Sequence, residues 1–126
     1  MTFAKWVFTI GGVWGVLIIA PLFVLEGVLA GASGPFSHPD TYYGFAASTL
    51  MWQFGYLVIG RDPARYRPFM LLGAGGKVIY FAACWALHLT GRIPIAVPLV
   101  ASPDILLAAL FVVAWFRTAP ARLAAV

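Results

Sequence analysis

Long apolar stretches separated by short polar segments dominate the pattern of residues along this chain. A helix needs about 20 predominantly apolar residues to cross the hydrocarbon core of a bilayer. The pattern therefore predicts an all-α fold: one membrane domain, residues 1–126, built as an integral membrane four-helix bundle. The predicted spans cover about 6–29, 42–60, 68–89 and 102–118.

Turn-forming residues mark the ends of the predicted spans. Residues 31–41 (GASGPFSHPDT) are rich in Gly, Pro and Ser and are predicted to form a loop. Pro68 is predicted to begin the third helix, because a proline at the first helical position loses no hydrogen bond. Within the first span, Gly11 and Gly15 are four residues apart, a spacing that can permit close contact with another helix.

The entry to the last helix has two competing interpretations. Residues 92–101 are apolar but contain two prolines, so they are expected to form a partly immersed loop or an irregular entry to the helix. After them, Ser102 is predicted to be the N-cap and Pro103 the first helical residue. Asp104 would then face the positive end of the helix, at the outer rim of the bundle.

Composition excludes the common soluble classes. Apolar residues make up 63% of the chain and charged residues 10%, whereas soluble domains carry roughly 45–50% and 25%. An ordinary soluble enzyme and a disordered segment are therefore excluded. A cleaved signal peptide is an alternative for the first span, but about 20 apolar residues exceed the usual 7–15, which favours an uncleaved helix. Cys84 is the only cysteine, so no internal disulfide can form.

The basic residues predict an orientation in the membrane. With four spans, the N-terminus, the middle loop and the C-terminus share one side and hold six Lys or Arg residues, whereas the two opposite loops hold only Arg92. Positive charge is retained on the cytoplasmic side. Both termini are therefore expected in the cytoplasm, in a multi-pass protein of the cell inner (plasma) membrane. The six residues are Lys5, Arg61, Arg65, Arg67, Arg117 and Arg122.

Lys77 is the residue with the highest expected free-energy cost of insertion into a membrane as part of a helix. It lies ten positions beyond Arg67, so roughly 15 Å into the membrane at 1.5 Å per residue. Snorkelling or a structural hydrogen bond could explain it, as could binding of an anionic ligand or proton relay. Gln53 is at similar depth, and a hydrogen bond from Gln53 to Lys77 is expected. Helical spacing puts a polar stripe on one inward face: Gly73, Lys77, Tyr80, Cys84 and His88.

A second polar group is predicted at the outer side, where helix ends meet water. Divalent metal binding, proton exchange near neutral pH and a solvated or salt-bridged rim are the alternatives, and the rim is favoured. The expected specific contact is a Glu26–Arg92 or an Asp104–Arg92 pair. No metal site is predicted. The group comprises Glu26, His38, Asp40, His88, Arg92 and Asp104.

Several short segments resemble a set of small bacterial four-span membrane proteins. The resemblance covers roughly residues 43–118, and its most specific part is a DPxRYRP loop followed by an intramembrane lysine, here Lys77. It implies the same four-span fold, and no catalytic residue can be carried over from it. The segments are Trp52-Gln53, the loop from Arg61 to Pro68, Met70, Lys77, Tyr80, Gly91-Arg92 and the run that begins at Asp104.

These features favour a non-enzymatic accessory or structural subunit in contact with membrane lipid, as a homo-oligomer or part of a larger membrane complex. The alternative is a small transporter or binder of an ion or small amphiphile. Its binding residues would be Lys77, Gln53, His88, Glu26 and Asp104. No cofactor and no nucleic-acid partner are expected. An intramembrane enzyme is a third class, but Cys84 and His88, one turn apart, lack an oxyanion donor and a third group.

Overall fold

The computed structural model describes residues 2–31 and 36–120, and there it is helical with short connections. This confirms the all-α class for the described residues. The middle of the predicted loop 31–41, and Arg122, lie outside them. The elements are α1 (Thr2–Ile19), a 3-10 helix η1 (Ala20–Phe23), α2 (Glu26–Ala30), α3 (Pro39–Arg61), α4 (Arg67–Leu89), α5 (Ala96–Ala101) and α6 (Pro103–Arg117).

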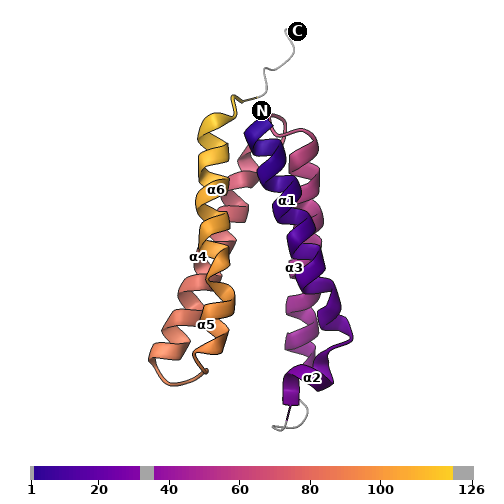
Figure 1. The fold of residues 1–126 in the computed structure, drawn as a ribbon, viewed down its shortest axis with the longest axis vertical. Coiled ribbons are helices and arrows are strands. Elements are labelled where there is room, and N and C mark those ends of the chain that lie inside the picture. The colour runs from indigo at the N-terminus through magenta and orange to yellow at the C-terminus, as the bar shows by residue number, and fades with distance from the viewer. Residues whose placement is uncertain (1, 32–35, 121–126) are drawn as a thin grey trace.

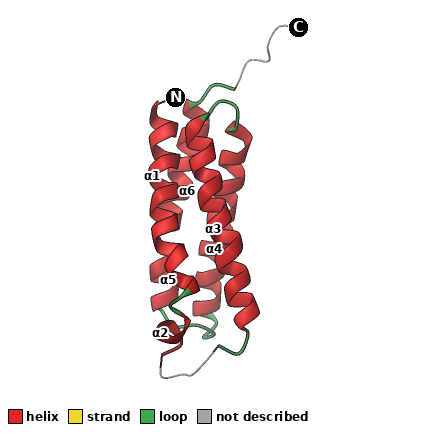
Figure 2. Cartoon of the chain, turned by 90° about the vertical axis from the view of Figure 1, so that its right-hand side faces the viewer, coloured by secondary structure: helices red, strands yellow, loops and turns green. Residues whose placement is uncertain are grey.

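The helices form two antiparallel hairpins that meet at one end and diverge at the other (Figure 1). One hairpin pairs α1 with α3, and the other pairs α4 with α5 and α6. Turned by 90°, the long helices follow the long axis of the molecule (Figure 2). We call the end where the hairpins meet the closed end. It holds the start of α1, the α3–α4 connection and the end of α6, where the Arg117 guanidinium lies 4.5 Å from the centre of the Phe3 ring.

Three helical segments of the described chain are long and apolar enough to cross a membrane, not the four predicted. They are Phe3–Phe23, Arg67–Leu89 and Ala96–Arg117. Helix α3 has 23 residues, as many as α4, but it is less apolar because Ser, Thr, Gln and Tyr residues interrupt it. The predicted third span at 68–89 coincides with α4. Pro68 lies in its first turn, as expected, and Gly91, with a φ of 77°, follows its end.

The helical path of the predicted first span, 6–29, changes geometry part-way along. Helix α1 ends at Ile19 and passes into η1, where the backbone N–H of Val24 donates to the carbonyl of Pro21 over 3.0 Å. Pro21 has no N–H to donate and its ring clashes with the preceding turn, so a regular α-helix is not maintained through it. Helix α2 then begins at Glu26.

Ser102 precedes α6 and Pro103 is its first residue, as predicted, but the Ser102 side chain does not cap the helix. Ser102 has helical φ and ψ of −61° and −33°, and its Oγ donates to the carbonyl of Pro98 over 2.7 Å instead of capping α6. Of the two interpretations of residues 92–101, the irregular helical entry fits the structure, because α5 leads through Ser102 directly into α6. Asp104 therefore lies inside a helical segment of 22 residues, not at its outer end.

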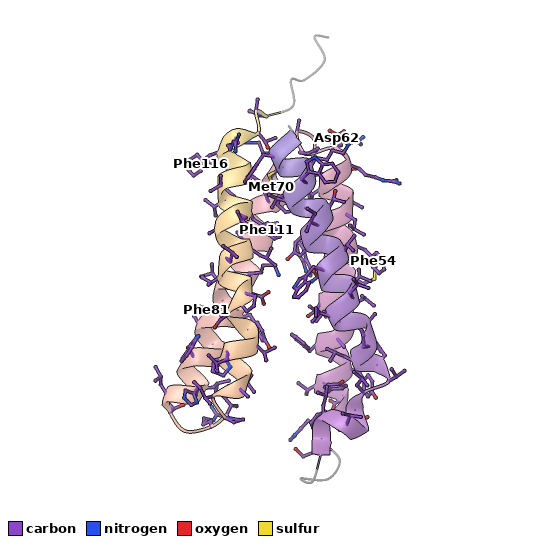
Figure 3. The ribbon with its side chains drawn as sticks, viewed as in Figure 1. Phe54, Asp62, Met70, Phe81, Phe111 and Phe116 are labelled. Atoms are coloured by element: carbon purple, nitrogen blue, oxygen red, sulfur yellow. The ribbon has the colours of Figure 1, made fainter. Side chains whose placement is uncertain are left out.

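A core of small and aromatic side chains joins the hairpins towards the closed end. Phe8 of α1 stacks on Phe111 of α6 with ring centroids 4.2 Å apart, and Tyr56 of α3 meets Phe111 edge-on at 4.9 Å. Met70 and Phe111 point into the region between the hairpins, whereas Phe116 points away from the bundle (Figure 3). The buried cluster contains Ala4, Phe8, Tyr56, Ile59, Met70, Ala74, Ala108, Phe111 and Ala114.

Glycine lets α1 approach α3 closely, whereas its contact with α6 at Gly11 has ordinary spacing. A Cβ at Gly12 would lie 2.9 Å from the backbone oxygen of Gln53, and one at Gly11 would lie 3.6 Å from the Phe111 ring. The prediction of close contact at this part of α1 fits these distances. The contact lies within the chain, so these glycines are not available to contact another copy.

Candidate functional site

Lys77 and Asp104 form an ion pair about halfway along the α4–α6 hairpin. Lys77 Nζ lies 3.1 Å from Asp104 Oδ1, and the two side chains are 10% and 29% exposed. Lys77 is near the middle of α4. Asp104 lies at the same level along the bundle as Lys77, because α5 adds six residues to the helical segment at the end opposite the closed end. Both charges are thus held inside an apolar bundle, where an unpaired charge is costly.

Aromatic rings cover the lysine on the side facing the core. Lys77 Nζ lies 5.4 Å from the centre of the Tyr56 ring and 5.9 Å from that of Phe111, within the range of cation–π attraction. Asp104 is in the first turn of α6, next to the passage from α5 into α6 at Ser102. The pair is therefore stabilised by the two rings as well as by its opposite charges.

The expected hydrogen bond from Gln53 to Lys77 is not the arrangement found. Gln53 Nε2 donates to the carbonyl of Thr49 over 3.0 Å, one turn back on α3. The rest of the side chain fills the space that Gly15 leaves on α1, so Gln53 is buried between α1 and α3. Lys77 instead takes its partner from α6, 27 residues further along the chain.

The predicted inward stripe of α4 is buried over most of its length. Gly73, Lys77 and Cys84 are buried, and a Cβ at Gly73 would lie 2.8 Å from the Tyr56 ring. Tyr80 is 37% exposed and stacks on Phe45 of α3, with ring centroids 5.6 Å apart. The stripe thus faces α3 and α6 at the level of the ion pair.

The structure does not bring the predicted outer group together. Glu26 Oε2 accepts a hydrogen bond of 2.8 Å from the hydroxyl of Tyr43, and His88 Nδ1 lies 3.0 Å from the carbonyl of Ile93. Among the described residues the one salt bridge is Lys77–Asp104, so neither predicted pair with Arg92 is formed. Within residues 2–31 and 36–120, no three His, Cys, Asp or Glu side chains lie close enough to hold a metal ion.

Arg67 has a structural role that the sequence did not suggest. Its Nε donates to the carbonyls of Trp115 and Thr118 over 3.1 and 2.6 Å, and its guanidinium lies 3.9 Å from the centre of the Trp115 ring. It therefore donates to two carbonyls at the end of α6, where the last carbonyls of a helix lack partners in a following turn; that of Trp115 also accepts from the backbone N–H of Thr118 over 3.4 Å. The only signal was its place beside Pro68 at the start of a helix, because its partners are 48 and 51 residues away.

Comparisons with known proteins do not identify the chain. No family model, curated protein or solved structure matches it. The chemistry of the site therefore has to be argued from its residues. A Lys–Asp pair can hold helices together, exchange a proton or bind a charged group. Nucleophilic catalysis is not supported, because Cys84 is buried and His88 is engaged by Ile93.

Proposed function

We propose that the protein crosses the inner (plasma) membrane four times, with both termini in the cytoplasm. Three segments meet the length and apolarity of a span, and α3 is supported as the fourth because it packs antiparallel along α1 and matches α4 in length. The closed end carries Lys5, Arg61, Arg65 and Arg117, so it is the cytoplasmic end by the distribution of positive charge.

Within that membrane, we propose a non-enzymatic role as a structural or accessory subunit. The observation that supports this proposal is that Lys77, Asp104 and Gln53, whose polar groups are unfavourable in the middle of a membrane, take partners inside the chain, whereas its outer faces are apolar. In each of the three candidate spans, the most apolar stretch of 18 residues has only 22–28% of its residues buried within the chain. Lipid or a second helical surface must cover the remainder.

The outer face of α4 is the part best suited to helix association. A Cβ at Gly75 or Gly76 would meet no other atom within 4 Å, and Ala82, Ala83 and Ala86 are exposed further along the helix. Small residues let membrane helices approach closely. We therefore propose that the protein associates through this face, with another copy or within a larger membrane complex.

The four-span topology predicts the location of reporters. Reporters at the two chain ends and at Ala64 in the α3–α4 connection should all be cytoplasmic, whereas one at Gly91 should be outside. Each location is measured with two fusions: an enzyme that is active only outside the cytoplasm, and a fluorescent protein that matures only in the cytoplasm. Chain ends on opposite sides would contradict the proposal, as would release of the protein from membranes by alkaline carbonate.

The association proposal predicts that Gly76→Leu lowers the oligomeric state. The leucine blocks close approach of a partner helix, and its Cβ has no other helix of its own chain within 4 Å. Native electrophoresis of gently solubilised membranes, and cross-linking in bilayers, should show the unmodified protein in a discrete assembly that the variant loses. Gly27→Leu in α2 is the matched control, because Gly27 also has open space around it. A monomer in both measurements would overturn this role.

A second candidate, a binder or transporter of a small ion or amphiphile, is favoured by one observation. Asp104 remains 29% exposed while its partner Lys77 is almost buried, so the carboxylate offers an accessible side to a proton or a charged group. The paired substitution of both residues described in the Discussion tests it, because that variant is expected to fold without either charge.

A further inference from the structure

A shallow groove runs between α3 and α4 on the outside of the bundle. It has a volume of about 440 Å³. The only hydroxyl in its wall, on Ser48, donates within α3 to the carbonyl of Gly44 over 2.9 Å, so the groove offers almost no free polar group. Its lining residues are Ser48, Met51, Trp52, Gly55 and Phe69.

The groove is elongated along the helix axis. Ser48, Met51 or Trp52, and Gly55 follow one another at intervals of three or four residues, which places them on one face of α3. From Ser48 to Gly55 this face extends roughly 10 Å at 1.5 Å per residue. A Cβ at Gly55 would meet only Trp52, at 3.9 Å, so the missing side chain leaves the groove open. An extended apolar chain fits this shape.

A basic residue lies beyond the closed-end side of the groove. The Phe69 ring is 6.5 Å from the ring of Tyr66, and the Arg65 guanidinium lies 5.5 Å from the centre of the Tyr66 ring. Arg65 and Arg61 are exposed. Asp62 is the nearby carboxylate, and its Oδ1 accepts a hydrogen bond of 3.4 Å from the backbone N–H of Arg65. The cationic side chain of Arg65 therefore lies beyond the Phe69 end of the apolar groove, with the Tyr66 ring between them.

We propose that the groove binds an acyl chain of an anionic phospholipid of the cytoplasmic leaflet, with its phosphate at Arg65. This rests on the proposed membrane placement, in which the closed end lies at the cytoplasmic surface. The aliphatic tail lies against Phe69, Gly55 and Trp52, and the headgroup lies where Arg65 is exposed. Anionic lipid is favoured over zwitterionic lipid because each basic residue near the surface strengthens its binding by about fivefold.

Lipid binding is measured on the full chain in bilayer nanodiscs that contain equal amounts of phosphatidylglycerol and phosphatidylcholine. After release from the discs, native mass spectrometry counts the lipids retained per protein. The unmodified chain is expected to retain phosphatidylglycerol in preference. Arg65→Gln should reduce that preference about fivefold, whereas Arg92→Gln, in the α4–α5 connection at the other end, should leave it unchanged. Equal retention of the two lipids, or equal effects of the two substitutions, would overturn the proposal.

Gly55→Leu tests the groove itself. A Cβ at Gly55 meets only Trp52, at 3.9 Å, so the leucine is expected to occupy the groove and abolish retention of the bound phosphatidylglycerol, whereas Gly27→Leu should not. Full retention in Gly55→Leu overturns the groove assignment. A changed oligomeric state with retained lipid would show that a second copy covers the groove, which also overturns it. Failure of the membrane proposal is seen separately, as release of the chain by alkaline carbonate before any nanodisc is made.

Discussion

Asp104→Leu is expected to destabilise the protein by about 3 kcal/mol, the lower end of the range for breaking a buried ion pair. The substitution leaves the ammonium of Lys77, whose side chain is 10% exposed, without its carboxylate among apolar neighbours. The lower end applies because the side chain of Asp104 is itself 29% exposed. Reversible unfolding in mixed detergent micelles, followed by the helical circular dichroism signal, measures the loss.

The matched control removes both charges. Lys77→Met combined with Asp104→Leu should recover most of the lost stability, because replacing a buried pair by apolar residues is often neutral. A single Asp104→Leu variant as stable as the unmodified protein would contradict the pairing. The double variant also separates the two functional candidates. If it folds, assembles and keeps every ion or amphiphile response of the unmodified protein, the binder or transporter hypothesis fails.

Gly12→Leu is expected to cost about 1–3 kcal/mol through overpacking. Already the Cβ would lie 2.7 Å from Leu57 Cδ2 and 2.9 Å from the backbone oxygen of Gln53. The side chain of Leu57 could move, but the α3 backbone cannot move without separating the hairpin. We expect a lower unfolding midpoint and weaker disulfide cross-linking between cysteines introduced at the α1–α3 contact, with Cys84 replaced by alanine.

Gly44→Leu provides the comparison for Gly12→Leu. Gly44 also lies in a long helix, but a Cβ there would meet no atom within 4 Å. Its replacement should leave stability unchanged or raise it slightly, because glycine disfavours a helix by roughly 0.5–1 kcal/mol relative to alanine. Equal losses in the two variants would show that the α1–α3 contact is not as close as described.

Local patterns predicted the features that depend on neighbouring residues. Apolar runs located α3 and α4, Pro68 and Gly91 marked the two ends of α4, and the spacing along α4 placed Lys77 on a buried face. They located the last helix, α6, but they missed the break in the first helix and the helical backbone at Ser102. There Pro21 interrupts a run that remains apolar, and Ser102-Pro103 resembles a helix start although the backbone is already helical.

The sequence by itself determined that the chain is helical, that its apolar content of 63% exceeds that of ordinary soluble domains, and that a lysine lies near the middle of one helix. These properties follow from composition and from the 3.6-residue period, which act over a few turns. Only the tertiary structure decided which partners the polar groups take: Asp104 for Lys77, Thr49 for Gln53, and the α6 carbonyls for Arg67. Pairs between helices depend on how each helix is rotated and shifted against its neighbour, and close packing at residues such as Gly12 and Phe111 sets that geometry.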